Sequence, residues 1–166
     1  MKIQQAVAQD LIDVLYLMKV CVSDMNEKGQ KHWNNAYPGT DFLIKSIEEN
    51  SLFIYKDVET VRGMIVLNEE EPEEYKNIEW QGKGEKILYL RFLAVHPNWQ
   101  GKGIAKRLVE YSEGYAKDHS YSSMRVDIYG GIDGSEKLCT DLGFSQTGQF
   151  HSKFQQTPYY AYEKSL

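Results

Sequence analysis

The sequence predicts an α/β domain: a central, mostly antiparallel twisted sheet with one parallel pair of strands and helices on both faces. The apolar runs 52–55 and 61–67 are separated by a short polar stretch, as in a β-hairpin. The apolar run 87–95 is followed by a helical pattern over 104–118 and an alternating run over 124–129. Because strand, helix and strand follow one another there, we expect a right-handed parallel crossover.

Length and composition indicate one ordinary soluble domain that covers residues 1–166. The 166 residues are 42% hydrophobic and 26% charged, and the net charge of −5 argues against nucleic acid as a partner. No apolar run approaches the roughly 18 residues of a membrane span, and the N-terminus does not resemble a signal peptide. We therefore expect a cytoplasmic protein without a membrane partner. The two cysteines, Cys21 and Cys139, lie far apart and are predicted to be reduced thiols.

The first half of the chain is predicted to contain a strand, two helices and a hairpin. The strand covers 2–7, and Asp10 is expected to cap the helix that follows it. The second helix begins at Thr40 or Asp41 and ends at Asn50, and Asp57-Val58-Glu59 forms the hairpin turn. Gly63 inside the returning strand predicts a bulge or a close contact at that position.

The second half is predicted to begin with a solvated excursion over 69–84. This segment holds five glutamates in its first half, one proline and two glycines. After the 124–129 strand, a glycine-rich loop leads into a short helix over 135–142. Two closing strands are expected at 146–154 and 159–164.

The junction between the 87–95 strand and the next helix has the features of an anion-binding turn. Gly101 and Gly103 precede a helix that begins at Ile104, where unpaired N–H groups and the positive end of the helix dipole meet. Many α/β proteins carry such a turn without a phosphate, so this pattern alone leaves both interpretations open. The spacing does not fit a Walker loop, and Lys106 occupies the position of the third glycine in a dinucleotide fingerprint.

The stretch 93–105 resembles motif A of the GCN5-related N-acetyltransferases, the GNAT family. Gln100, Gly103 and Ala105 stand at motif positions, and the stretch 138–144, which ends in a Gly-Phe corner, resembles motif B. The two motifs lie at the family's spacing, and weaker similarity in the order of elements covers nearly the whole chain. The resemblance implies the GNAT fold, whose parallel strands splay apart to admit acetyl-CoA.

The resemblance also implies which residues bind acetyl-CoA. Backbone groups of Leu93 and Val95 would hold the pantetheine arm and polarise the thioester carbonyl, and the amides of 100–105 would take the pyrophosphate. Lys102 and Lys106 would add positive charge, although a lysine in a turn is more often merely solvated. The predicted acetyl-CoA-binding residues are Leu93, Ala94, Val95, Gln100, Gly101, Lys102, Gly103, Ile104, Ala105 and Lys106.

Two positions depart from the family's catalytic pattern. Family members often carry a tyrosine that protonates the departing thiolate; here that position is Cys139, either an acid or a small packed residue. The glutamate that many members carry on the central strand is Arg91 here, so no general base carries over. Candidates for the base are Glu79, Glu85 and Tyr89, acting directly or through water, although residues of this kind are more often structural or exposed than catalytic. The candidate catalytic residues are therefore Cys139, Tyr89 and Glu79.

The resemblance also implies that the acceptor site lies near the aromatic loop between the first two helices, where this family usually forms one wall of that site. Trp33 and Tyr37 would form one wall, since aromatic faces suit an amine cation or the apolar body of a small molecule. The acidic stretch 69–74 would attract a cationic amine, or it is simply a solvated loop. Asp127 would orient a group in the cleft, or it forms a salt bridge at the edge of the sheet.

The expected function is that of an acetyl-CoA-dependent N-acetyltransferase. The acetyl group would pass to a primary amine of a small molecule or peptide by direct attack in a ternary complex. The alternative is a non-catalytic acetyl-CoA-binding module that serves as a sensor or scaffold. The four histidines show no metal-site spacing, so no metal is expected. The sequence identifies neither the acceptor amine nor the oligomeric state, and it leaves a homodimer open.

Overall fold

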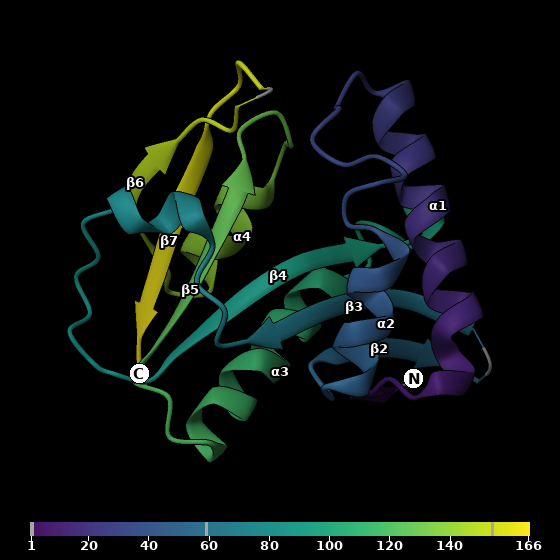
Figure 1. Ribbon diagram of the computed structural model, residues 1–166, viewed down its shortest axis with the longest axis horizontal. Coiled ribbons are helices and arrows are strands. Elements are labelled where there is room, and N and C mark those ends of the chain that lie inside the picture. The colour runs from purple at the N-terminus through teal and green to yellow at the C-terminus, as the bar shows by residue number, and fades with distance from the viewer. Residues whose placement is uncertain (1, 59, 154) are drawn as a thin grey trace. The chain divides into compact units, whose positions relative to one another are not determined.

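A computed structural model describes residues 2–58, 60–153 and 155–166 (Figure 1). Its strands are β1 (Lys2–Gln5), β2 (Leu52–Asp57), β3 (Thr60–Asn68), β4 (Ile87–Val95), β5 (Ser123–Tyr129), β6 (Ser145–Phe150) and β7 (Tyr159–Ser165). Its α-helices are α1 (Leu11–Glu27), α2 (Thr40–Glu48), α3 (Ile104–Asp118) and α4 (Ser135–Asp141). Three short 3-10 helices are η1 (Ala8–Asp10), η2 (Glu73–Asn77) and η3 (Pro97–Trp99).

The described strands form a seven-stranded mixed sheet, in the order β1-β2-β3-β4-β5-β7-β6. Strands β4 and β5 pair in parallel, whereas β1–β2, β2–β3, β5–β7 and β6–β7 pair antiparallel. The predicted fold class is therefore confirmed. The chain divides into two compact units: one runs up to Leu67 and includes Phe92–Tyr111, and the other comprises Asn68–Arg91 and Ser112–Leu166.

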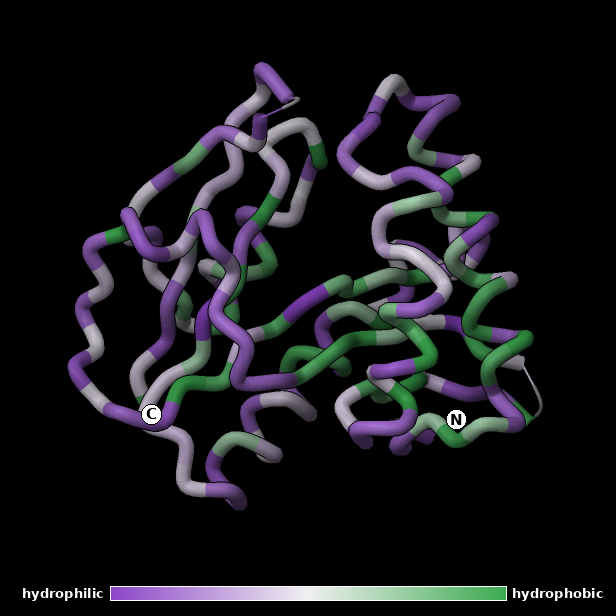
Figure 2. The backbone as a smooth tube through the Cα atoms, viewed as in Figure 1, coloured by the Kyte–Doolittle hydropathy of each residue, from purple (hydrophilic) through white to green (hydrophobic). Residues whose placement is uncertain are grey.

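The first unit has helices on both faces of its strands. Alternate residues of β2 and β3 form a core with α1 and α2; they are Leu52, Ile54, Met64 and Val66, all fully buried. The other face receives the first half of α3, where the rings of Phe53 and Tyr111 lie 5.4 Å apart. Figure 2 shows these strands as largely hydrophobic. The period-2 alternation thus lets one sheet bury both of its faces.

Gly63 makes the close contact predicted for it. A Cβ atom there would lie 2.9 Å from Cγ2 of Ile104 and 3.1 Å from the carbonyl oxygen of Ala94. The absence of a side chain therefore lets the start of α3 approach β3. The irregularity in the pairing of β2 with β3 lies between Tyr55 and Lys56 on the neighbouring strand.

Asp10 precedes α1 as predicted, but its side chain does not cap that helix. Its carboxylate accepts the Val7 N–H at 3.0 Å and pairs with the Lys56 ammonium at 2.7 Å. Burial raises the pKa of Asp10, but these hydrogen bonds outweigh that effect and leave the pKa below its ordinary value. The Asp10 carboxylate therefore forms a tertiary ion pair with Lys56 of β2 instead of the helix cap that the sequence pattern predicted.

The second unit contains the parallel pair. Its register runs from Ile87 opposite Ser123 to Leu90 opposite Val126, and β7 lies between β5 and β6. The predicted closing strand over 146–154 is shorter in the structure, where β6 ends at Phe150, and Phe154 lies outside the described residues. Glu59, predicted as part of the hairpin turn, also lies outside them.

The segment 69–84 is more ordered than the predicted solvated excursion. Figure 2 shows a largely hydrophilic tube, and all five of its leading glutamates are exposed. Tyr75, however, is fully buried, and the Trp80 indole N–H donates to the Tyr75 carbonyl at 3.1 Å. These two aromatic residues fix the segment on the sheet, so the prediction of a solvated excursion holds for the five glutamates and is wrong for Tyr75.

Among the described residues, no helix has the length and apolar character required to cross a bilayer.

Candidate functional site

All ten predicted acetyl-CoA-binding residues lie in the first unit, at the end of β4, in the turn after η3 and at the start of α3. Polar bonds fix the path of this segment. The Gln100 side-chain amide donates to the Val95 carbonyl at 3.2 Å, and the His96 N–H donates to the Arg62 carbonyl at 2.8 Å. His96 Nδ1 accepts the Asn98 N–H at 3.2 Å. The turn is therefore held to both β4 and β3.

The two glycines of the turn create space beside the helix N-terminus. Gly101 and Gly103 have φ angles of 72° and 78°, and a Cβ atom at either position would meet nothing within 4 Å. The first helical bond runs from the Arg107 N–H to the Gly103 carbonyl at 3.1 Å. The N–H groups of residues 104–106 therefore have no acceptor within the helix. Open space, convergent donors and the helix dipole fit a pyrophosphate.

Two cations lie over one aromatic ring beside this turn. The Lys102 ammonium and the Arg62 guanidinium lie 4.4 and 4.5 Å from the centroid of the Trp99 ring. Lys106 is exposed, with its ammonium 3.8 Å from Glu110. Both lysines add positive charge at the start of α3, and their contact with a phosphate stays a prediction.

The Val95 carbonyl already has two protein donors. It accepts the Gln100 amide and, at 3.5 Å, the thiol of Cys21. A carbonyl oxygen has two lone pairs, so this group is engaged within the protein. The role predicted for it with the pantetheine arm therefore rests on the other peptide groups of residues 93–95.

Phe92 is a residue of this site that the sequence did not indicate. It lies in the middle of β4 with a φ angle of 51°, a left-handed conformation that is rare for an aromatic residue in a strand. The alternation of buried and less buried side chains along β4 is interrupted before Phe92. Residues 88–90 are all buried, whereas burial alternates over 92–95. Such outliers persist only where surrounding packing enforces them, and they concentrate at functional sites.

Three aromatic rings hold Phe92 in place. The ring centroids of Trp33, Tyr37 and Phe42 lie 5.8, 5.4 and 4.8 Å from that of Phe92. Trp33 is partly buried, and Tyr37 is 49% exposed. The structure therefore brings both predicted acceptor residues against β4, one position before the residues predicted to hold acetyl-CoA. Their contact with an acceptor stays a prediction.

The candidate bases lie in the second unit and differ in environment. Tyr89 is 5% exposed, and burial, followed by the charge of Glu71, raises the pKa of its phenol. A buried phenol with a raised pKa keeps its proton, which suits a hydrogen-bond donor better than a base. Glu79 is exposed on the segment 69–84, and Glu85 is exposed before β4. The catalytic roles of Tyr89 and Glu79 stay predictions.

Cys139 packs inside the second unit on α4. It is 7% exposed, and burial raises the pKa of its thiol to about 12. An acid with this pKa is a poor proton donor to the departing thiolate, whose thiol has a pKa of about 8.5.

We therefore expect Cys139→Ala to leave kcat within about threefold, because general acid catalysis contributes roughly 10²-fold or more where it operates. The same change is expected to lower the free energy of unfolding by about 1 kcal/mol through lost packing. Steady-state kinetics and denaturant unfolding of the variant measure both quantities. A kcat lowered by about 100-fold with unchanged stability would instead identify Cys139 as the acid.

Comparison with known proteins agrees with this geometry. The model of the acetyltransferase (GNAT) family matches residues 18–144. The chain is 23% identical to the uncharacterised N-acetyltransferase YesJ of Bacillus subtilis over 164 residues, which cover 97% of this chain and 88% of YesJ.

Two solved structures share the fold. An acetyltransferase of the GNAT family from Streptococcus agalactiae has a TM-score of 0.82 at 16% identity, covering 99% of this chain and 95% of that one. The PaiA N-acetyltransferase from Thermoplasma acidophilum, solved in complex with coenzyme A, has a TM-score of 0.74 at 14% identity, covering 99% and 98%. The sheet order, the glycine turn before α3 and the family match lead to one conclusion: the chain belongs to the GNAT acetyltransferase family.

Proposed function

We propose that the protein is an acetyl-CoA-dependent N-acetyltransferase that acts in the cytoplasm on a primary amine of a small molecule or peptide. The observation that carries this proposal is the open glycine turn between β4 and α3, with Gly101 and Gly103 at positive φ beside the helix N-terminus. Membership of the GNAT family supports acetyl-CoA as the donor. The coenzyme A complex of PaiA supports the same class of ligand.

The residues of the first unit would bind and orient the donor. The N–H groups at the start of α3 would donate hydrogen bonds to the pyrophosphate, and the peptide groups of residues 93–95 would align the pantetheine arm along β4. A peptide N–H there would also stabilise negative charge that develops on the thioester oxygen. The attacking amine must be neutral, and holding it next to the thioester accounts for much of the expected rate enhancement.

The direct test is release of free coenzyme A by the purified chain. The chain would be mixed with acetyl-CoA and a panel of aliphatic amines, arylalkylamines and peptides with a free N-terminus, with thiol detection and mass spectrometry as readouts. We expect thiol release that requires an amine and equals the amount of acetylated amine formed.

Two other results would contradict the proposal in different ways. Tight binding of acetyl-CoA without turnover of any amine would indicate the non-catalytic binding module. Failure of the folded chain to bind acetyl-CoA at all would overturn the assignment of the donor.

A further inference from the structure

A pocket of about 320 Å³ lies between α1 and α2, within the first unit. The two helices pack against each other, and the loop after α1 joins them (Figure 1). One wall of the pocket is a single face of α1, where Leu15, Met18, Lys19 and Val22 follow one another at helical spacing. The opposite wall comes from the loop and the start of α2. The volume lies in the range of pockets that hold small organic molecules.

The interior of this pocket is apolar and its rim is polar. Met18, Val22 and Leu43 line it and are buried. Lys19 and Asn35 also line it and are exposed. Small-ligand sites commonly have this composition, in which apolar side chains bury the body of the ligand and a few polar groups fix its orientation.

The polar rim offers hydrogen-bond donors and one positive charge. The Asn34 side-chain oxygen already accepts the Ala36 N–H at 2.8 Å, so this amide has its N–H donors left for a ligand. Lys19 has no carboxylate three or four positions away on α1, and its ammonium forms no ion pair within the residues that the structure describes. The rim therefore complements a group with negative charge and several acceptor atoms, such as a carboxylate.

Backbone hydrogen bonds fix the loop that closes the pocket. The Asn34 N–H donates to the Tyr37 carbonyl at 2.9 Å, and the Tyr37 N–H donates to the Asn34 carbonyl at 3.2 Å. The Leu43 N–H donates to the Gly39 carbonyl at 3.3 Å at the start of α2. A ligand would therefore meet a largely preformed site, which lowers the entropic cost of binding.

The pocket is separate from the two sites that the sequence predicted. None of the described residues that line it belongs to β4, the glycine turn or α3, where the donor is predicted to bind. The predicted acceptor residues Trp33 and Tyr37 do not line it either, and their rings lie 5.8 and 5.4 Å from that of Phe92. The loop thus directs these rings to β4 and other side chains, among them Asn34 and Asn35, to the pocket.

We propose that this pocket binds a small organic anion, a carboxylate on an apolar body. The Lys19 ammonium and the side-chain amides of Asn34 and Asn35 hold the carboxylate, because donors without a protein acceptor and one unpaired cation meet at the rim. The buried apolar side chains cover the body. The inference does not depend on acetyl transfer, and it adds a second binding site to the one proposed for the donor.

The test is an NMR titration of the isotope-labelled full chain with probes of one shape and different charge. They are 3-phenylpropanoate, the neutral 3-phenylpropanamide and the cationic 3-phenylpropylamine. We expect the carboxylate to bind best and the amide to bind about tenfold more weakly, which corresponds to the loss of one charge-assisted hydrogen bond. The side-chain amide signals of Asn34 and Asn35 should shift with the carboxylate. Acetate should bind more weakly than 3-phenylpropanoate, because it has almost no apolar body to bury.

Variants of one lysine separate the pocket from general attraction of anions. Lys19→Met should weaken binding of 3-phenylpropanoate by about tenfold and leave binding of the neutral amide unchanged. Lys19→Arg keeps the charge and should keep the preference for the carboxylate. Lys45→Met, at an exposed position of α2 that does not line the pocket, is the matched control and should change neither probe. Both positions are exposed, so the thermal midpoints of unfolding should stay close to that of the native chain.

Three results would overturn the site. The first is no preference of the native chain for the carboxylate, and the second is unchanged affinity in Lys19→Met. The third is displacement of 3-phenylpropanoate by acetyl-CoA with shifts confined to the amides of 101–106, which would place the anion at the glycine turn. Failure of the native chain to bind acetyl-CoA would refute the proposed function but not this pocket, so the two failures are distinguishable.

Discussion

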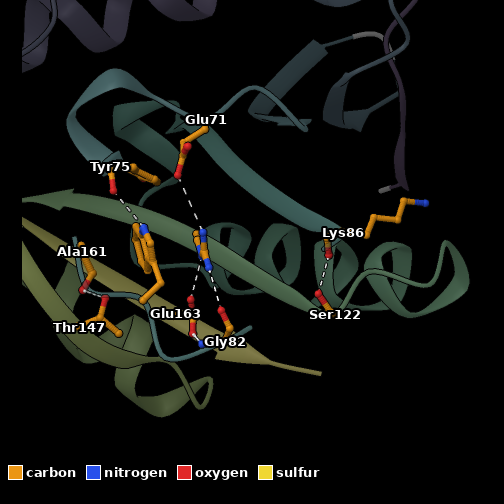
Figure 3. Close-up of polar contacts among 10 residues, drawn as sticks. Glu71, Tyr75, Gly82, Lys86, Ser122, Thr147, Ala161 and Glu163 are labelled. Carbon is orange, nitrogen blue, oxygen red and sulfur yellow. Dashed lines mark hydrogen bonds and ion pairs between the residues drawn. The ribbon is translucent and has the colours of Figure 1, made fainter. Parts of the chain in front are cut away.

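Replacing Glu163 with alanine is expected to lower the free energy of unfolding by about 3–5 kcal/mol, because it leaves a buried guanidinium without its carboxylate. The side chains of Arg125 and Glu163 are 8% and 3% exposed and lie 2.8 Å apart. Glu163 also accepts the Gly82 N–H, so the change removes the tie between β7 and the segment 69–84. Glu71 lies 4.0 Å from Arg125 and its side chain is 38% exposed, so it cannot replace the lost partner (Figure 3). Urea unfolding monitored by tryptophan fluorescence measures the loss.

The double variant Arg125→Met/Glu163→Met is the matched control. Apolar residues in place of both partners remove the uncompensated charge, so much of the lost stability should return. A cost of less than about 1 kcal/mol for Glu163→Ala, the range of exposed ion pairs, would show that the pair is solvated rather than buried.

Replacing Gly103 with glutamate is expected to weaken acetyl-CoA binding by about 100-fold or more, since a like charge at a binding contact costs several kcal/mol. Gly103 has a φ angle of 78°, and a Cβ atom there would point into open space beside the start of α3. The introduced carboxylate would occupy the helix N-terminus and repel the pyrophosphate. Calorimetric titration with acetyl-CoA measures the effect.

Gly29→Glu is the matched control for backbone strain. Gly29 has a φ angle of 74° and also meets nothing within 4 Å of a built Cβ, but it lies after α1. Both substitutions should cost about 1–2 kcal/mol of stability, because both place a side chain in the left-handed region. Only Gly103→Glu should lose acetyl-CoA. Equal affinity in the two variants would mean that the donor does not bind at this turn.

The sequence predicts the central strand and the helix after it without error, at 87–95 and 104–118. Both have strong patterns: a continuous apolar run bounded by proline, and an amphipathic helix preceded by glycines. The parallel pairing follows from the order of these elements, because only a crossover connects them. Local patterns were therefore sufficient for the fold class.

Tertiary contacts decide the features that the sequence did not predict. The acidic composition of 69–84 indicated a solvated loop. Tyr75 and Trp80 nevertheless hold the segment on the sheet by packing there, while its glutamates stay exposed. The positive φ of Phe92 has no sequence signal, because aromatic residues rarely adopt it. The bond between Tyr75 and Asp127 joins residues 52 positions apart, so no local pattern reports it.

The candidate site likewise has a part that local sequence patterns predict and a part that they do not. The predicted donor turn is a local motif, so its glycines and the helix start can be found in the sequence, whereas its link to acetyl-CoA comes from the resemblance to the family. Catalysis and acceptor recognition are predicted to depend on single side chains of different elements. No motif marks these side chains here, because Cys139 and Arg91 stand where members of the family often carry a tyrosine and a glutamate. Burial then supplies part of the missing information, as at Tyr89 and Cys139.

Binding of acetyl-CoA at the glycine turn is the central claim, and amide hydrogen exchange of the native chain with and without acetyl-CoA tests it most directly. We expect slower exchange at residues 93–95 and at the first-turn amides 101–106 when acetyl-CoA is present, with the start of β1 unchanged. Saturating acetyl-CoA that leaves exchange at 101–106 unchanged would contradict the claim.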